Sequence, residues 1–246
     1  MRMDLLIDIG NTSAKIAVAE PIRDSNQSSE VGIVHFERLS EPWHVAFARL
    51  RSIFGLSSVR ISSVTGEDVE LNAALEEMDV PIIRLTAEVP CPVKPVQNVP
   101  KTLGADRWAA DIGALSQDPN STLLVIDAGT CLTYDVISRE GVLLGGAISP
   151  GVQLRLNAMH EHTALLPFVA AEDEAVLMGY DTRTAMLSAA VNGTRFEMEG
   201  YIRQLLCEYS DLHVFITGGN TFSFSQDVRS HVTHDPYLVF RGLRAL

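Results

Sequence analysis

The sequence predicts an α/β protein made of two similar halves, and three observations lead to this prediction. Strand-like and helix-like segments alternate over roughly the first 85 residues and again after position 121. An apolar run that ends in Asp-x-Gly occurs at Asp8 and again at Asp127, about half the chain apart. The chain has 246 residues, of which 46% are hydrophobic, so it can bury a sizeable core.

The first half alternates strands with helices in an order that suits a mixed sheet. Apolar runs predict strands at 5–9, 16–18, 31–36, 59–64 and 80–85. Helices are expected at 42–54, where Pro42 suits the first turn, and at 68–78. We therefore expect an N-terminal domain over residues 1–117.

A proline-rich stretch at 87–100 follows, and its prolines exclude a regular helix or a central strand. Two interpretations stay open for it: a plain surface connection, or a stiff loop that lines a site. A helix is expected next, at 102–115, with Asp106 and Arg107 in its first turn, where anions are favoured. From its position alone, Asp106 is equally well explained as a helix-stabilising acid, and Arg107 as a surface charge.

The second half repeats the pattern, and we expect a C-terminal domain over residues 118–246. After the strand–turn–strand unit at 124–137 come a strand leading into 145–151 and a helix at 152–159. A long helix is expected at 181–209, although Gly193 and Gly200 weaken it. A strand at 212–217 then leads into Gly218 and Gly219, and residues 238–246 are expected to form a short strand and a helix.

Composition excludes several classes of function. The net charge of −12 argues against general binding of nucleic acid or of an anionic membrane. The three cysteines form no C-x-x-C pair, so neither a disulfide framework nor a zinc site is indicated. No apolar run approaches the roughly 18 residues that span a bilayer, and no leader pattern opens the chain. We therefore expect a cytoplasmic protein.

The paired Asp-x-Gly turns favour nucleotide chemistry. Such a hairpin can present backbone N–H groups, a threonine hydroxyl and a metal-binding carboxylate to a phosphate chain. Two of them in one chain suggest a two-lobed phosphotransferase, in which an acid holds Mg²⁺ and a lysine neutralises the γ-phosphate. A third carboxylate can accept the proton of the substrate hydroxyl.

Six motifs, in this order along nearly the whole chain, resemble the type III pantothenate kinase family. They are Asp8-Ile9-Gly10-Asn11-Thr12-Ser13-Ala14-Lys15, Pro100-x-x-Leu103-Gly104-Ala105-Asp106-Arg107, Asp127-Ala128-Gly129-Thr130, Gly145-Gly146-x-Ile148-x-Pro150-Gly151, Thr163-Ala164-x-Leu166-Pro167 and Asp235-Pro236-x-Leu238-x-x-x-Gly242-Leu243. Each motif is weak alone, whereas their ordered combination is specific.

The resemblance implies the fold of the acetate and sugar kinase/Hsp70/actin superfamily. In that fold two duplicated actin-like, ribonuclease H-like lobes, each a mixed sheet with helices, hold ATP in the cleft between them. The implied reaction is the phosphorylation of pantothenate by ATP to 4′-phosphopantothenate, the first step of coenzyme A biosynthesis. The implied cofactors are Mg²⁺ and a monovalent cation, K⁺ or NH₄⁺, and the implied assembly is a homodimer.

The resemblance also assigns roles to individual residues. Asp106 is the implied catalytic proton acceptor, Asp8 an implied ligand of Mg²⁺ and Asp127 of K⁺. The implied ATP-binding residues are Asp8, Ile9, Gly10, Asn11, Thr12, Ser13, Ala14, Lys15, Thr130, Gly218 and Gly219. The implied pantothenate-binding residues are Gln97, Gly104, Ala105, Asp106, Arg107 and Thr182.

One position departs from the family pattern. The family commonly has a tyrosine three residues before the proline that precedes its Leu-Gly-x-Asp-Arg motif, and this chain has Gln97 there. Glutamine can hydrogen-bond but supplies no aromatic wall. Gln97 therefore motivates one alternative, the same fold acting on another small hydroxyl compound. A second alternative is a non-catalytic regulatory or transcription-accessory relative, since some proteins of this family carry that label. The retained Asp8, Lys15, Asp106 and Asp127 argue against the second.

Overall fold

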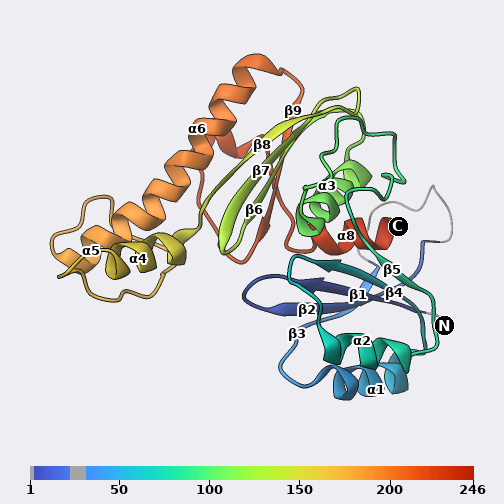
Figure 1. Cartoon of the computed structure of the whole chain (residues 1–246). Coiled ribbons are helices and arrows are strands. Elements are labelled where there is room, and N and C mark those ends of the chain that lie inside the picture. Colours follow the sequence, from blue (N-terminus) through green and yellow to red (C-terminus); the bar gives the residue numbers. More distant parts are fainter. Residues whose placement is uncertain (1–2, 23–31) are drawn as a thin grey trace. The chain divides into compact units, whose positions relative to one another are not determined.

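The computed structural model describes residues 3–22 and 32–246, and these residues group into two compact units (Figure 1). Unit 1 comprises Met1–Pro119, Gly141–Leu143 and Tyr237–Leu246, and unit 2 comprises Asn120–Glu140 and Leu144–Pro236. The predicted domains, 1–117 and 118–246, differ from this grouping chiefly at the last ten residues, and their boundaries stay a prediction. The first residue of the strand predicted at 31–36 lies outside the described residues.

Unit 1 contains a five-stranded mixed sheet in the order β3-β2-β1-β4-β5. Its central strand β1 runs antiparallel to β2 and parallel to β4; β3 extends the antiparallel side and β5 the parallel side. The bounds are β1 Met3–Ile9, β2 Ala14–Ala19, β3 Ile33–Arg38, β4 Leu56–Ser63 and β5 Ile82–Arg84.

Unit 2 repeats this topology, with a sheet in the order β8-β7-β6-β9-β10. Its central strand β6 runs antiparallel to β7 and parallel to β9, and β10 adds a parallel edge. The bounds are β6 Thr122–Ala128, β7 Cys131–Ile137, β8 Leu143–Pro150, β9 Leu212–Gly218 and β10 Val232–His234. The predicted α/β class and the predicted duplication are therefore confirmed.

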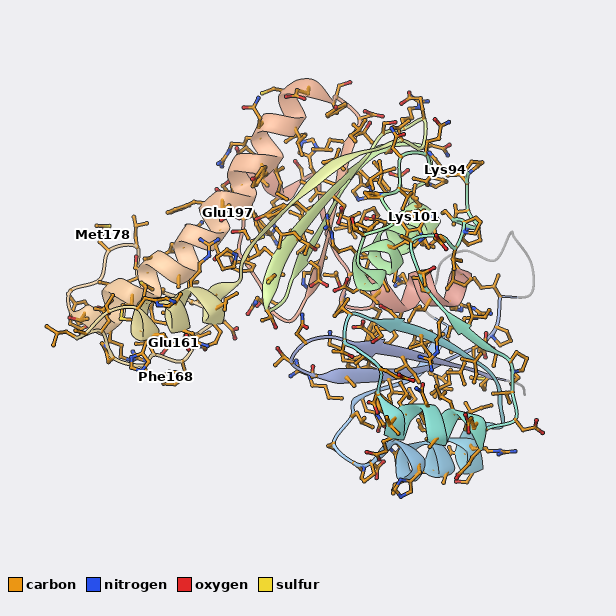
Figure 2. The ribbon with its side chains drawn as sticks, in the orientation of Figure 1. Lys94, Lys101, Glu161, Phe168, Met178 and Glu197 are labelled. Atoms are coloured by element: carbon orange, nitrogen blue, oxygen red, sulfur yellow. The ribbon has the colours of Figure 1, made fainter. Side chains whose placement is uncertain are left out.

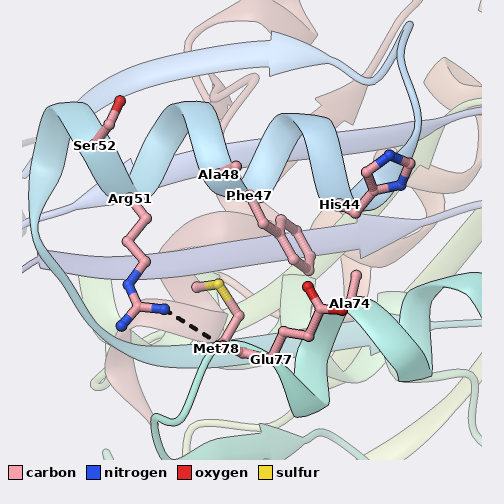
Figure 3. A pocket seen from close by; sticks show the side chains of 8 residues that line it. All are labelled: His44, Phe47, Ala48, Arg51, Ser52, Ala74, Glu77 and Met78. Carbon is pink, nitrogen blue, oxygen red and sulfur yellow. Dashed lines mark hydrogen bonds between the residues drawn. The ribbon is translucent and has the colours of Figure 1, made fainter.

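The two faces of the first sheet have different coverings because side chains alternate along a strand. The odd-numbered residues Leu5, Ile7 and Ile9 share one core with helices α1 (Trp43–Phe54) and α2 (Val69–Glu76). A pocket of about 350 Å³ lies between these two helices, and Figure 3 shows the side chains that line it. This pocket belongs to the covering of the odd-numbered face, whereas Asp8 points to the other.

The even-numbered face carries a buried ion pair that reaches helix α8 (Leu238–Ala245). Ser58 donates to Asp4 Oδ1 at 2.6 Å, and Arg60 Nη2 lies 3.3 Å from Asp4 Oδ2. Arg60 Nη1 also donates to the carbonyl of Leu243, at 3.2 Å, and to that of Arg244. The Arg60 guanidinium thus pairs with the last carbonyls of α8, at a helix C-terminus, where positive charge is favourable.

Helix α3 (Ala105–Gln117) packs against α8 at very close range. A Cβ atom at Gly113 would lie 2.1 Å from the Leu238 oxygen, and one at Gly242 would lie 1.8 Å from the Ala109 oxygen. Only glycine fits at either position, so two glycines from distant parts of the sequence fix the crossing of these helices. This contact holds the helix that carries Asp106.

Unit 2 has one long helical run, made of α5 (Thr182–Leu187), the π-helical turn η1 (Ser188–Asn192) and α6 (Gly193–Glu208). The predicted helix at 181–209 is therefore confirmed, with a π turn inside it. Its α6 part packs Met198 and Ile202 against the sheet. The remaining helices of the unit are α4 (Val152–Glu161) and the short α7 (Gln226–Arg229).

The end of the chain differs from the prediction. The short strand expected before the last helix is absent, because Leu238–Ala245 is helical throughout. The edge strand instead lies earlier, as β10, whose three residues are too few to show a periodic pattern. Among the described residues, no helix has both the length and the apolar character needed to cross a membrane.

Candidate functional site

The first Asp-x-Gly hairpin joins β1 to β2 through residues 10–13. Gly10 N donates to the Ser13 oxygen at 3.1 Å, and Asn11 and Thr12 are exposed at the tip. Asp8 and Lys15 face each other across the two strands, with 3.7 Å between Asp8 Oδ2 and Lys15 Nζ. The structure thus brings together the two ends of the predicted phosphate-binding run.

Asp8 is buried and electrostatically perturbed. Burial raises the pKa of this carboxyl to about 6, and the charge of Asp106 acts in the same sense, whereas the Lys15 ammonium and the Ser62 hydroxyl lower the pKa. Asp8 Oδ1 has no hydrogen-bond partner in the described protein, although it is buried. A buried oxygen of this kind requires a partner, and Mg²⁺ favours carboxylate oxygen as a ligand.

Asp106 lies in the first turn of α3. This helix begins at Ala105, three residues later than its predicted start at 102. Its Oδ1 accepts a hydrogen bond from the backbone of Arg107 at 2.7 Å. A Cβ atom at Gly104 would lie 2.6 Å from the same oxygen, so glycine is needed for this side-chain position. The start of α3 lies beside the end of β1: a Cβ atom at Gly104 would lie 3.8 Å from Val64 Cγ1, and Val64 N donates to the Ile9 oxygen at 3.1 Å. The charge of Asp106 raises the pKa of Asp8, so the two carboxylates interact within unit 1.

The proline-rich stretch at 87–100 has no helix and no regular strand, and several hydrogen bonds hold it in place. Trp108 Nε1 donates to the Val89 oxygen at 3.0 Å. The backbone of Gln97 donates to Gly141 at 2.8 Å and accepts from Leu143 at 3.0 Å, while its side chain is exposed. The predicted absence of a helix and of a central strand is therefore confirmed, whereas both interpretations of the stretch, a surface connection or a stiff loop that lines a site, stay predictions.

The second hairpin, between β6 and β7, repeats the arrangement of the first. Asp127 is half-buried and pairs in register with Thr133 on β7 and with Thr217 on β9. Gly129 N donates to the Cys131 oxygen at 3.1 Å, which closes the turn. The exposed Thr130 accepts a hydrogen bond from Gly151 N at 3.0 Å through its carbonyl.

Residues 218–220 are fixed against this second hairpin. Gly218 has a φ of 103°, and a Cβ atom there would lie 2.5 Å from the Ala128 backbone. Asn220 Nδ2 donates to the Ala128 oxygen at 3.0 Å. The structure therefore brings Gly218 and the neighbouring exposed Gly219 beside the Asp127 turn.

Asn220, which was given no role from the sequence, also lies beside the Asp127 turn. Its position directly after the glycine pair was the available signal. Thr182 is the exposed first residue of α5, next to Asp181, whose carboxylate accepts from Thr184 N at 2.7 Å. The role of Thr182 in binding substrate stays a prediction.

Within residues 3–22 and 32–246, no group of three or more histidine, cysteine or acidic side chains could hold a metal ion. A cation at Asp8 or Asp127 would therefore take most of its ligands from water and from phosphate oxygens. Mg²⁺ sites in phosphotransferases commonly have this composition, with one or two protein carboxylates.

The protein-family model for type III pantothenate kinase matches residues 4–204 of this chain. A type III pantothenate kinase from Bacteroides fragilis is 38% identical and aligns over 99% of this chain and 97% of its own. One from Phocaeicola vulgatus is also 38% identical with the same coverage, and one from Christiangramia forsetii is 34% identical over 98% and 96%.

A solved structure from Campylobacter jejuni, assigned by its name to the Baf family of transcriptional activators, has the same fold. Its TM-score is 0.55 at 20% identity, and the match covers 98% of this chain and 95% of that one. At this identity the likeness extends to the fold alone. The family model and the curated relatives, which span nearly the whole chain, show that this protein belongs to the type III pantothenate kinase family.

Proposed function

We propose that this chain phosphorylates pantothenate with ATP, giving ADP and 4′-phosphopantothenate, the first step of coenzyme A biosynthesis. Family membership over nearly the whole length supports the reaction. The observation that carries the proposal is the pair of carboxylates in unit 1. The turn that leads into Asp106 packs on Val64, which is hydrogen-bonded to the end of the strand that carries the buried Asp8, and the charge of Asp106 raises the pKa of Asp8. The Asp8 carboxylate suits a metal ion, and the Asp106 carboxylate suits the proton of the acceptor hydroxyl.

In the proposed mechanism, the acceptor hydroxyl oxygen attacks the γ-phosphorus as the bond to the β–γ bridging oxygen breaks. Asp106 accepts the hydroxyl proton, and Lys15 neutralises charge on the transferred phosphoryl group. Because phosphoryl transfer passes through a loose transition state, correct placement contributes more than the strength of the base. An ordinary aspartate, held by Arg107 N at the start of α3, can fill this role.

We assign Mg²⁺ to Asp8 and a monovalent cation, K⁺ or NH₄⁺, to Asp127. The unpartnered Oδ1 supports the first assignment. The carboxylate of Asp127, flanked by the in-register Thr133 and Thr217, offers oxygen donors that suit a hard cation. When bound, Mg²⁺ would neutralise the phosphate charge that develops during transfer.

The remaining residues follow the same assignment. The backbone and hydroxyls of residues 9–14 would contact the phosphates of ATP, and Thr130, Gly218 and Gly219 would border the nucleotide. Gln97, Gly104, Ala105, Arg107 and Thr182 would contact pantothenate. The guanidinium of Arg107 suits the carboxylate of pantothenate because it can donate two parallel hydrogen bonds.

The test is ADP release by the folded protein with ATP, Mg²⁺ and K⁺, with and without pantothenate. We expect turnover that depends on pantothenate and falls when K⁺ is replaced by Na⁺. The absence of pantothenate-dependent turnover would contradict the proposal. A panel of other small hydroxyl compounds, assayed in parallel, tests whether Gln97 has changed the acceptor.

We further infer a homodimer that forms through unit 2. Large apolar side chains are exposed there, and the most exposed are Ile148, Leu165, Phe168, Leu177, Met178 and Tyr180. In the view of Figure 2, Phe168 and Met178 lie on either side of α4 and α5. Exposed apolar groups in such number are typical of protein–protein interfaces.

The segment that carries three of these side chains is held firmly on the helical run. Ser188 Oγ donates to the Leu177 oxygen at 2.6 Å, Asn192 Nδ2 to the Val176 oxygen at 3.0 Å, and Tyr180 N to Thr184 Oγ1 at 3.1 Å. A surface already ordered in the free chain binds at a lower entropic cost.

A cytoplasmic location remains our expectation, supported by three free thiols, Cys91, Cys131 and Cys207.

The change Met178→Asp is expected to weaken this dimer by at least about tenfold, because burying a methionine contributes about 1.5–3 kcal/mol and an interfacial charge opposes it. Light scattering after size exclusion, over a range of protein concentrations, measures the effect. Val69→Asp is the matched control, because Val69 on α2 is 78% exposed and Met178 is 82% exposed. A wild-type protein that stays monomeric at micromolar concentration would contradict the dimer.

A further inference from the structure

A row of three side chains crosses the first sheet at the level of Asp8. Lys15 on β2 and Ser62 on β4 both pair in register with Asp8 on β1. In-register side chains on neighbouring strands leave the sheet on the same face and lie side by side. The Ser62 hydroxyl is therefore the neighbour of the Asp8 carboxylate on the side away from Lys15.

Ser62 is fully buried, and its hydroxyl oxygen makes no hydrogen bond of ordinary geometry in the described protein, although it lies near enough to Asp8 to lower the pKa of that carboxyl. The adjacent Asp8 Oδ1 also makes no such hydrogen bond. Buried oxygens without partners are uncommon in folded proteins, because each one retains the cost of its desolvation. Two of them on neighbouring strands indicate a place for a shared ligand from outside the chain.

A second pair on the same two strands shows that the protein can satisfy this arrangement by itself. Asp4 and Ser58 also pair in register, and Ser58 Oγ donates to Asp4 Oδ1 at 2.6 Å. Arg60 completes that pair from 3.3 Å. In the Asp4 pair the serine hydroxyl has a protein acceptor, and the Arg60 guanidinium faces Asp4 Oδ2, which accepts no hydrogen bond. In the Asp8 pair neither the serine hydroxyl nor Asp8 Oδ1 makes a hydrogen bond of ordinary geometry, although the strands and residue types are the same.

The duplicated sheet repeats the combination. In unit 2, Thr217 on β9 pairs in register with Asp127 on β6, as Ser62 on β4 pairs with Asp8 on β1. Each half therefore has a hydroxyl residue on the parallel neighbour, directly beside the acid of its Asp-x-Gly turn. Both hydroxyl residues are buried, at 0% exposure for Ser62 and 2% for Thr217.

We propose that Ser62 belongs to the magnesium site and that its hydroxyl hydrogen-bonds a water ligand of the cation beside Asp8. Mg²⁺ retains several waters when it binds to one or two carboxylates, and those waters need acceptors or donors from the protein. Ser62 is thus a positioning residue, and the inference rests on the proposed assignment of Mg²⁺ to Asp8. Loss of such outer partners commonly weakens metal binding by about 10- to 100-fold.

The test measures binding of ADP by calorimetry with excess Mg²⁺ and, separately, with a chelator. In Ser62→Ala we expect affinity for ADP with Mg²⁺ to fall about tenfold, with affinity for ADP alone unchanged. The melting temperature without ligand should stay the same or rise, because a buried hydroxyl without a partner has been removed. Ser62→Thr, which retains a hydroxyl, should restore most of the affinity.

Ser58→Ala is the matched control, because it removes the same hydroxyl from the same strand. It should lower the melting temperature and leave the affinity for ADP with Mg²⁺ unchanged, since Ser58 donates to Asp4. Wild-type affinity in Ser62→Ala, or an equal loss with and without Mg²⁺, would overturn the proposal. These measurements need no pantothenate, so failure of the proposed kinase reaction would be seen separately, as absent pantothenate-dependent ADP release.

Discussion

Asp106→Asn is expected to lower kcat by about 10²- to 10⁴-fold, the usual contribution of a general base. Asparagine has nearly the same shape and can still accept the hydrogen bond from Arg107 N, so the start of α3 should be retained. It cannot accept the proton of the acceptor hydroxyl. Steady-state kinetics at saturating ATP and pantothenate measure the loss.

The same substitution has a second, independent effect. The charge of Asp106 raises the pKa of Asp8, so the neutral asparagine should lower that pKa. Glu76→Gln, an exposed position on α2, is the control for the loss of one negative charge. A kcat within threefold of the wild-type value in Asp106→Asn would show that another group accepts the proton.

Asp8→Asn is expected to lower activity with Mg²⁺ by roughly 10³-fold and to make the ligand-free protein more stable at neutral pH. The activity falls because a carboxylate ligand of the cation is lost. The stability rises because the folded protein no longer buries a carboxylate that has Lys15 as its ion-pair partner at 3.7 Å and an open Oδ1.

The pH dependence of the stability effect has a definite sign. In the folded chain the pKa of Asp8 is about 6, above the ordinary 3.8, so between these values the folded state binds the proton and the unfolded state does not. Stability therefore falls as pH rises through this window, and Asp8 costs up to about 3 kcal/mol at pH 7. Asparagine removes this cost, so the gain should be roughly 2–3 kcal/mol at neutral pH and vanish below about pH 4.

Chemical denaturation near pH 7 and near pH 4 measures the difference. Asp4→Asn is the contrasting variant on the same strand, because Ser58 donates to the Asp4 carboxylate and Arg60 faces it. It should be less stable than wild type, since Arg60 loses its buried partner, and it should retain activity. Equal stability of Asp8→Asn and wild type near pH 7 would contradict the burial of a charged Asp8.

The sequence predicted the fold class and the duplication because their signals are local. The apolar runs, the repeated Asp-x-Gly turns and the proline-rich stretch each report on a few consecutive residues. The strand order was not predicted, and the structure has the same order in both halves. The last strand was misplaced because β10 is only three residues long and exists through its pairing with β9.

The site was predicted less completely, because its missing members are defined by their neighbours across the sheet. The sequence places Ser62 in a strand but gives it no function, because its register with Asp8 is known only from the sheet. Asn220 is held beside the Asp127 turn by a hydrogen bond to Ala128, which is far away in the sequence. By contrast, Asp106 could be assigned by resemblance alone, since it lies within a compact motif at a helix start.

The glycine crossing of α3 with α8 also bears on how the chain is made. These helices pack through Gly113 and Gly242, with the whole of unit 2 between them in the sequence. During synthesis, α8 can pack on the even-numbered face of the first sheet only after the ribosome has translated unit 2. The first unit to be translated is thus the last to be completed, because α8 supplies contacts to α3, β1 and β4 that no earlier segment makes in its place.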